Sequence, residues 1–425
     1  MLTFDFNLSL PVIILLACAA ACALLVWPIY LRRISRVSRY AASQSGPEAY
    51  QPDTEHTADV TEPAGEGFLI SNDDVSTDIA TNDMPTGTEP ASIVVYAQDE
   101  AESLTRLLHQ LLEQRYAPGF EVIVVNEGGS ETTADAVSAL AVSHSNLYLT
   151  YTPDGARNLS RKKLALMLGI KAARHRVVVQ TVATACIESP YWLASIMRHF
   201  TDTSTEVVLG NAMPAATDNG LGSRRRAFDF AASATAWLTS AIAGHPYRGT
   251  EYNIAYTRDI FFRNKGFSRS LNLRYGDDDI FISEIANGAN TAVELSPDGL
   301  VRMAFHNHAA ACSELAMRHE FTGRRISRTS RRLMALGAWM LWAMTGLAIW
   351  AAVISLPNII PAIAAAVLLI AMFTAVTLVW RKEMRRLGGK KLCLTIPWLA
   401  LTLPLRNAWR TLHCRGRHGR HYSWC

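Results

Sequence analysis

The sequence predicts an α/β protein with a doubly wound, mostly parallel sheet and transmembrane helices at both ends of the chain. Between residues 91 and 180, short apolar runs alternate with amphipathic segments, a pattern typical of a parallel sheet covered by helices. Uncharged stretches long enough to cross a bilayer lie before and after this region. Three carboxylates follow a glycine at Gly276-Asp277-Asp278-Asp279, and they are the leading candidates for a catalytic group.

The N-terminal 40 residues are expected to form a membrane anchor with a basic flank. Residues 9–31 carry no charge, and about 20 apolar residues span a bilayer. A cleaved signal peptide is the alternative, but it needs positive charge before its apolar core, whereas Asp5 precedes this segment and Arg32, Arg33, Arg36 and Arg39 follow it. The positive-inside rule then puts the N-terminus outside and residue 32 onward in the cytoplasm.

Residues 41–90 are predicted to be a flexible acidic linker. They are rich in Thr, Asp, Glu, Pro, Gly and Ser, and contain no Lys or Arg. Such a composition cannot bury enough apolar surface to offset the entropy of ordering. The chain as a whole has 41 basic and 37 acidic residues, and the basic ones dominate after residue 302. This asymmetry indicates a membrane surface as a partner and no nucleic acid.

The region from residue 91 is expected to hold one α/β domain that ends at residue 331. Four strands are predicted at residues 92–97, 120–125, 147–150 and 177–180, with helices at 99–113, 131–143 and 162–173. In such a sheet, ligands bind at the carboxyl ends of the strands. The seven cysteines are scattered without metal-binding spacing, which fits a reducing compartment.

The carboxylates after Gly276 have two interpretations. Adjacent carboxylates repel one another, so the proton affinity of one of them rises, and such a group suits general base catalysis. Alternatively, the turn only caps the next helix, since Asp is favoured at helix N-termini. Taken alone, these residues favour the capping interpretation, and the motifs elsewhere in the chain favour catalysis.

Six motifs occur in a consistent order along residues 89–331. They are Tyr96-Ala97-Gln98-Asp99-Glu100, Asn126-Glu127-Gly128-Gly129-Ser130-Glu131, Lys162-Lys163-Leu164-Ala165-Leu166, Glu251-Tyr252-Asn253-Ile254-Ala255-Tyr256, Phe261-Phe262-Arg263-Asn264-Lys265-Gly266-Phe267 and Gly276-Asp277-Asp278-Asp279. Together they resemble the motifs of family 2 glycosyltransferases with a GT-A fold. The resemblance implies an enzyme of polysaccharide biosynthesis that moves a sugar, with inversion, from a nucleoside diphosphate sugar to a lipid-linked or glycan acceptor.

The resemblance also implies roles for individual residues. Asp278 would be the catalytic base, supported by Asp277 or Asp279, and Glu251 and Asn253 would line the acceptor side. The nucleotide would be bound by strand-end residues and by the basic helix start, namely Asp99, Glu100, Asn126, Glu127, Lys162 and Lys163. The alternatives are helix capping for the acidic residues and a solvated basic face for the two lysines.

A divalent metal, Mg²⁺ or Mn²⁺, is a further implication of the resemblance. Family members carry Asp-x-Asp after the fourth strand, and these cations prefer hard oxygen ligands. In this chain Val182 and Thr184 occupy the corresponding positions. Glu188 lies four residues after Thr184. The loop after the fourth strand would need a different path for Glu188 to replace the metal-binding carboxylates. This departure supports an alternative function, a catalytically inactive glycosyltransferase-like subunit with a binding or assembly role.

The C-terminal part is predicted to return to the membrane. Residues 333–354 and 359–380 form two apolar segments with basic residues on the same side, so the hairpin of residues 332–381 returns to the cytoplasm. In residues 382–425, an apolar stretch is expected to be broken by Pro397 and Pro404 and is too short to span. It is expected to be interfacial or re-entrant, and a basic tail follows it.

Three spans are expected in all, with four as the alternative. The protein is therefore placed in the inner (plasma) membrane as a multi-pass protein with a cytoplasmic catalytic domain. Members that use membrane acceptors have a Gln-x-x-Arg-Trp-like element, matched here near Arg324 and Arg325, which would hold a diphosphate. The alternative is that these arginines only flank a membrane helix.

Overall fold

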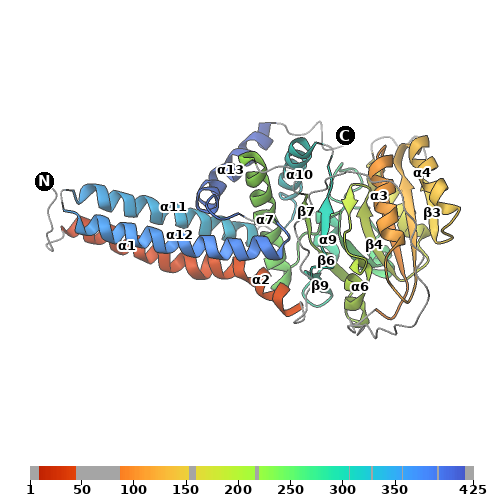
Figure 1. Cartoon of the computed structure of the whole chain (residues 1–425), viewed down its shortest axis with the longest axis horizontal. Coiled ribbons are helices and arrows are strands. Elements are labelled where there is room, and N and C mark those ends of the chain that lie inside the picture. The colour runs from red at the N-terminus through yellow and green to blue at the C-terminus, as the bar shows by residue number, and fades with distance from the viewer. Residues whose placement is uncertain are drawn as a thin grey trace, which may run out of the picture.

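An apolar helical stalk projects from an α/β domain in the computed structural model of this chain (Figure 1). The structure describes residues 9–44, 87–152, 159–215, 220–305, 307–326, 329–356, 358–389 and 392–416. Most of the predicted acidic linker, and the end of the predicted basic tail, lie outside these residues.

The main sheet has seven strands in the order β3-β2-β1-β4-β8-β6-β9. The strands are β1 (Ala91–Ala97), β2 (Phe120–Asn126), β3 (Leu147–Tyr151), β4 (Val177–Val182), β6 (Val207–Gly210), β8 (Ile254–Thr257) and β9 (Thr291–Glu294). The first four pair in parallel, β6 and β9 also pair in parallel, and β8 runs antiparallel to both of its neighbours. The prediction of a mostly parallel sheet is confirmed.

Helices cover both faces of this sheet because side chains alternate along each strand. Val94 of β1 belongs to the core under α5 (Arg161–Ala172), while its neighbours Ile93 and Val95 belong to the core under α3 (Ala101–Leu112) and α4 (Glu131–Ala141). Helix α5 lies very close to the sheet, since a Cβ at Gly169 would come within 2.7 Å of Val94. This close packing fixes the start of α5 relative to the strand ends.

The second half of the domain adds a three-stranded sheet and further helices. The small sheet has the order β5-β10-β7, with β5 (Ala185–Cys186), β7 (Ala212–Pro214) and β10 (Val301–Met303). The helices are α6 (Trp192–Met197), α7 (Leu221–Ile242), α8 (Arg258–Arg263), α9 (Asp279–Ile285) and α10 (His308–Thr322), with short 3₁₀ turns at Glu127–Gly129 and Arg198–Thr201.

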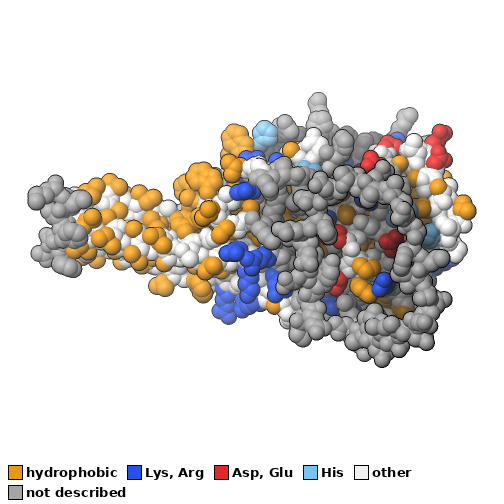
Figure 2. All heavy atoms as spheres, viewed as in Figure 1, with side chains coloured by type: hydrophobic (Ala, Val, Ile, Leu, Met, Phe, Trp, Pro, Cys, Tyr) orange, Lys and Arg blue, Asp and Glu red, His pale blue; other side chains and the backbone are white. Residues whose placement is uncertain are grey.

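The stalk combines segments from opposite ends of the chain. Helix α1 (Leu10–Val26) continues through a π-helical turn (Trp27–Leu31) into α2 (Arg32–Gln44), and it lies beside α11 (Thr329–Ile354) and α12 (Ile360–Arg386). Within the described residues, three helices are long and apolar enough to cross a membrane: Leu10–Gln44, Thr329–Ile354 and Ile360–Arg386. Figure 2 shows hydrophobic side chains along the stalk and basic ones where it meets the domain.

Helix α13 (Ile396–Gly416) differs from the sequence expectation. The prolines were expected to break this region, but Pro397 lies in the first turn and Pro404 lies inside one continuous helix. A first-turn proline removes no intrahelical hydrogen bond. Contacts with α11 stabilise the rest of the helix, since the Trp342 indole of α11 donates a 2.5 Å hydrogen bond to the Leu401 carbonyl.

Candidate active site

Lys163 holds the loop that leads to the carboxylates. Its side chain is fully buried, and its ammonium donates to the carbonyls of Ser270, Leu273 and Tyr275 at 2.5, 3.2 and 2.9 Å and to the Ser270 hydroxyl at 3.1 Å. Burial lowers its pKa to about 8. An ammonium has three donors, so these acceptors use all of them. The structure thus places Lys163 inside the protein as a loop anchor.

The turn at Gly276 depends on glycine. Its φ is +104°, a conformation that L side chains rarely adopt, and a Cβ there would come within 2.6 Å of Ile280. Helix α9 begins directly afterwards. Asp278 Oδ1 accepts a 2.9 Å hydrogen bond from the Asp279 N–H, and Asp279 Oδ1 accepts one of 2.8 Å from the Ile280 N–H. Helix capping, the simpler interpretation, therefore does occur here.

The three consecutive carboxylates nevertheless have different partners. Asp277 Oδ2 lies 2.8 Å from Lys162 Nζ, and Asp277 Oδ1 lies 3.9 Å from the Arg318 guanidinium. Burial alone would raise the pKa of Asp277, but these two cations outweigh it and lower the pKa to about 2. Asp279 accepts a short hydrogen bond from the Thr322 hydroxyl and lies 3.5 Å from Arg248.

Asp278 is left as the carboxyl group that holds a proton near neutral pH. Burial is the main cause, and the adjacent Asp279 and Asp277 add to it, so that the pKa of Asp278 rises to about 7. A like charge and a low dielectric both disfavour the ionised form. A group with this pKa can take up or release a proton under physiological conditions.

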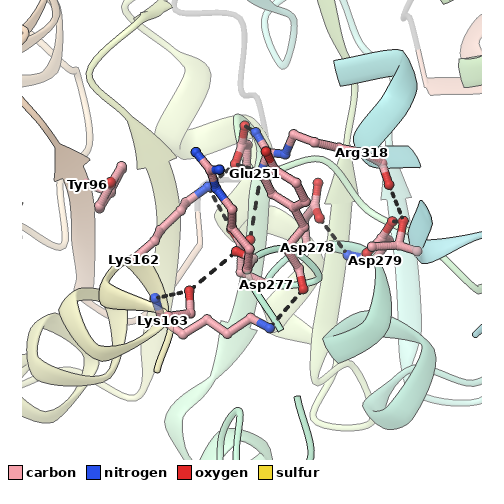
Figure 3. A network of polar contacts seen from close by, with 12 residues as sticks. Tyr96, Lys162, Lys163, Glu251, Asp277, Asp278, Asp279 and Arg318 are labelled. Atoms are coloured by element: carbon pink, nitrogen blue, oxygen red, sulfur yellow. Dashed lines mark hydrogen bonds and ion pairs between the residues drawn. The ribbon is translucent and has the colours of Figure 1, made fainter. Parts of the chain in front are cut away.

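Lys162, Glu251, Asp277 and Arg318 form a charge cluster (Figure 3). Lys162, in the first turn of α5, makes ion pairs with both Glu251 and Asp277. Arg318, on α10, donates two hydrogen bonds of 2.9 Å to Glu251 and stacks 4.7 Å from the centre of the Tyr275 ring. Two cations and two carboxylates from four separate parts of the chain thus meet beside Asp278.

The strand-end residues lie next to this charge cluster. The Tyr96 hydroxyl, at the end of β1, donates a 2.5 Å hydrogen bond to Glu127 after β2, and its ring lies 5.3 Å from Lys162 Nζ. Glu127 is buried, Glu100 is half-buried and Asp99 is exposed. Burial raises the pKa of Glu100.

Two predicted site residues serve mainly to hold the local structure. Asn126 is buried and donates a 2.8 Å hydrogen bond to the Ser130 carbonyl, which closes the turn after β2. The Asn253 amide donates to the carbonyls of Asn211 and Gly299 at 3.0 and 2.8 Å and accepts from the Trp192 indole at 3.2 Å. The side chain of Asn253 is fully buried, so the structure brings Glu251, and not Asn253, to the charge cluster.

The residues at the end of β4 and directly after it do not fit a divalent metal. Val182 is a buried apolar side chain, and the Thr184 hydroxyl lies 3.1 Å from the Tyr252 hydroxyl. Glu188 is 63% exposed and lies 3.8 Å from Arg302, outside the charge cluster. Among the described residues, no group of three or more His, Cys, Asp or Glu side chains could hold a metal ion. The carboxylates near Asp278 already have partners: Glu251 and Asp277 pair with Lys162 and Arg318, and Asp279 contacts Thr322 and Arg248.

Arg318 is the residue that the sequence reasoning missed. Arg324 and Arg325 follow α10, and Arg325 is exposed and stacks 4.8 Å from the centre of the Phe321 ring. Arg318 lies earlier on the same helix and reaches the charge cluster. The sequence contains one signal that could have identified Arg318, namely that His319 follows it. An arginine followed by an aromatic ring has the same order as the Arg-Trp pair of the expected Gln-x-x-Arg-Trp-like element.

Comparison with known proteins shows a family match over part of the chain and solved structures with the same fold. Residues 92–273 match the family model described as Glycosyl transferase family 2. A mannosyltransferase, PcManGT from Pyrobaculum calidifontis in complex with GDP-Man and Mn²⁺, is 18% identical, with 93% of this chain and 99% of that chain covered at a TM-score of 0.51.

Two further solved structures are less similar. They are glucosyl-3-phosphoglycerate synthase from Mycobacterium tuberculosis (13% identity, 60% and 80% of the two chains covered, TM-score 0.35) and mannosyl-3-phosphoglycerate synthase from Rubrobacter xylanophilus (13%, 56% and 76%, TM-score 0.34). No curated protein matches the chain. Residues 92–273 are therefore similar to family 2 glycosyltransferases, and the α/β domain that contains them has a GT-A fold.

Proposed function

We propose that this glycosyltransferase moves a sugar from a nucleoside diphosphate sugar to a lipid-linked or glycan acceptor, with inversion at the anomeric carbon. The observation that carries the proposal is Asp278, a buried carboxyl group with a pKa of about 7 beside the charge cluster. A general base is most effective when its pKa is close to the working pH. Asp277 and Asp279 are held by other side chains, which leaves Asp278 for this role.

In the proposed reaction, Asp278 accepts the proton of the acceptor hydroxyl. The hydroxyl oxygen attacks the anomeric carbon, and the bond between that carbon and the diphosphate oxygen breaks. The nucleoside diphosphate leaves with the bonding electrons, and a single displacement inverts the configuration. Among the described residues, hydrogen bonding occupies only Oδ1 of Asp278, so Oδ2 remains for the acceptor.

The strand-end residues are assigned to the nucleotide. Glu127 follows β2, Asp99 and Glu100 follow β1, and these two parallel strands are neighbours in the sheet. Carboxylates there suit the ring N–H of a base and the hydroxyls of a ribose, which all donate hydrogen bonds. No step is assigned to a divalent metal, because Val182 and Thr184 supply no carboxylate.

A lipid-linked acceptor is supported by the contacts that connect the charge cluster with α13. Arg318 lies on α10, and Glu320 of the same helix accepts a 3.2 Å hydrogen bond from Thr411 of α13. Helix α13 carries exposed apolar side chains at spacings that share one face, namely Trp398, Leu405, Trp409 and Leu412. Such a helix is suited to lie in a membrane interface, which would bring the charge cluster near membrane-bound acceptors.

The proposed location is the inner (plasma) membrane, with several passes and the glycosyltransferase domain in the cytoplasm. Exposed or half-buried arginines follow the first apolar helix, and others lie in the last turn of α12. Basic residues are retained on the cytoplasmic side of membrane helices. The same side holds the α/β domain.

A catalytically inactive subunit is the second candidate, because Val182 and Thr184 replace the expected Asp-x-Asp. Both candidates are tested by assaying membranes for transfer and donor hydrolysis with a panel of nucleotide sugars. We expect Asp278→Asn to lower the rate by at least about 100-fold, the usual contribution of a general base.

Asp135→Asn is the matched control, because Asp135 is an exposed carboxylate on α4, and it should leave the rate unchanged. Equal rates for Asp278→Asn and the unmodified protein would exclude the base role. No turnover of any donor by the unmodified protein would favour the inactive subunit.

A further inference from the structure

The net charge of the charge cluster can be compared with that of a metal site that has the Asp-x-Asp carboxylates. An Asp-x-Asp pair with one divalent cation carries no net charge. In this chain the pair is replaced by Val182 and Thr184, yet Lys162 and Arg318 face Glu251 and Asp277. Two side-chain cations and two carboxylates also sum to zero. The charge cluster therefore has the same balance as a metal site, with tethered monovalent cations in place of the ion.

Both cations are built into the protein. The side chains of Lys162 and Arg318 are only 15% and 16% exposed. Lys162 is set in place by the close packing of α5 on the sheet, and Arg318 by its two hydrogen bonds to Glu251 and by the Tyr275 ring. Their positions thus need no bound ion.

Lys162 and Arg318 also keep donors for a ligand. An ammonium has three N–H donors and a guanidinium has five, which is more than their bonds to Glu251 and Asp277 use. Arg and Lys both bind phosphate through charge-assisted hydrogen bonds. Each side chain also keeps a small exposed part.

A divalent cation would compete poorly for the same carboxylates. To reach Asp277 it would have to displace the Lys162 ammonium at 2.8 Å, and to reach Glu251 it would have to break the two hydrogen bonds from Arg318. Displacing either side chain leaves a nearly buried cation without its partner, which is costly.

We propose that Lys162 and Arg318 bind the diphosphate of the nucleotide directly and take the place of a divalent metal, so that this chain binds nucleoside diphosphates without one. The inference rests on the proposed function, and it assigns to this chain a metal-independent form of that site. Removing Lys162 takes away the nearest cation of Asp277 and one of the two cations of Glu251, and leaves Arg318 to face both carboxylates. The site then has a net negative charge, and binding should become metal-dependent.

The test is calorimetry of UDP and GDP with the full-length protein in detergent, in excess EDTA and again with Mn²⁺. For the unmodified chain we expect the Kd of the preferred nucleotide to differ less than about threefold between the two conditions. Lys162→Ala should weaken binding in EDTA by about tenfold or more, the cost of one charge-assisted phosphate contact, and Mn²⁺ should restore part of it.

Two variants and one measurement guard against trivial outcomes. Lys171→Ala changes a lysine that is exposed on the same helix and should bind as the unmodified chain does. Lys162→Arg keeps the cation and should retain binding in EDTA. Thermal unfolding of each variant reports whether it is folded. If Lys162→Ala does not fold, the metal dependence of nucleotide binding is judged from the other two proteins. Nucleotide binding by Lys162→Arg and by the unmodified chain is then compared in EDTA and in Mn²⁺.

The outcomes separate this inference from the proposed function. Binding by the unmodified chain only with Mn²⁺ would overturn the inference and leave the proposed transfer reaction standing. Binding of neither nucleotide under either condition would overturn both. Equal binding of Lys162→Ala and the unmodified chain in EDTA would show that Lys162 does not hold the diphosphate.

Discussion

Asp277, Asp278 and Asp279 are adjacent in the chain, yet their side chains meet different surroundings. Two cations hold Asp277 ionised, with a pKa of about 2, whereas Thr322 and Arg248 hold Asp279. Asp278 has a pKa of about 7 because burial and its two neighbours oppose ionisation. At the scale of single residues, the distribution of nearby cations therefore distinguishes three otherwise identical side chains.

The transfer rate should increase with pH through about 7, because a base acts in its deprotonated form and Asp278 loses its proton in that range. Asp279→Asn removes a neighbouring negative charge, so the pKa of Asp278 should fall and the midpoint of the pH–rate profile should move to lower pH. The measurement is the transfer rate between about pH 5.5 and 8.5, with nucleotide binding at each pH as the control. An unchanged midpoint would contradict the proposed coupling.

The raised pKa of Asp278 also predicts an effect on stability. The folded protein holds this proton more tightly than the unfolded chain does. Asp278 therefore contributes stability that is fully present below the ordinary pKa of Asp, about 4, and is lost as the pH rises through about 7. The opposite holds for Asp277, whose contribution is present above about pH 4 and is lost as the pH falls through about 2.

At the scale of elements, helix α5 positions the loop before α9. Ser160 caps α5 by accepting a hydrogen bond from the Lys163 N–H, and the Ser160 N–H donates a 2.9 Å bond to the Leu271 carbonyl. The Lys163 side chain then bonds three further carbonyls of the same loop. One helix start thus supplies both Lys162 for the charge cluster and Lys163 for the loop that carries Asp277.

Lys163→Met should destabilise the protein by about 3 kcal/mol, because it leaves several buried carbonyls without a donor. Lys171→Met, on the exposed side of the same helix, should change the free energy of unfolding by less than about 0.5 kcal/mol. Thermal unfolding in detergent measures both. A stable Lys163→Met variant that has lost only nucleotide binding would instead support the direct ligand role predicted for Lys163.

At the scale of the whole molecule, the stalk joins the two ends of the chain. Tyr30, at the end of the first apolar helix, is buried against Gly337 of α11, and its ring lies 6.5 Å from the Trp380 ring of α12. The α/β domain is built from the residues between these segments (Figure 1). The first helix therefore depends on α11 and α12 for its packing partners.

Gly337→Leu should separate α1 from α11, because even a Cβ at residue 337 would come within 2.6 Å of the Tyr30 Cβ. Overpacking of this kind costs about 1–3 kcal/mol. Gly346→Leu is the control, since no atom lies within 4 Å of a Cβ built at that position on the same helix. Hydrogen exchange of residues 10–31 in detergent should be faster only in Gly337→Leu, and equal exchange in both variants would argue against this packing.

The fold and the general location of the site could be predicted because they depend on local patterns. Alternating apolar runs predicted β1 to β4. The helical spacing in residues 99–113 predicts one apolar face formed by Leu104, Leu107, Leu108, Leu111 and Leu112, and the first four are buried while Leu112 is half-buried. The acidic turn after Gly276 was found from adjacent residues alone. Such features follow from the periods of helices and strands, which the sequence shows directly.

The amino-acid sequence by itself determined the four parallel strands β1 to β4, the three apolar helices and the row of carboxylates. Only the tertiary structure decided which charges meet. Lys162 and Glu251 are separated by 89 residues and Arg318 lies a further 67 along the chain, so no local pattern pairs them. The tertiary structure likewise gives the two adjacent lysines different surroundings. Lys162 lies beside Asp277, and Lys163 is buried among carbonyls. Electrostatic interactions depend on distance and burial in three dimensions, and these are set when the distant segments pack together.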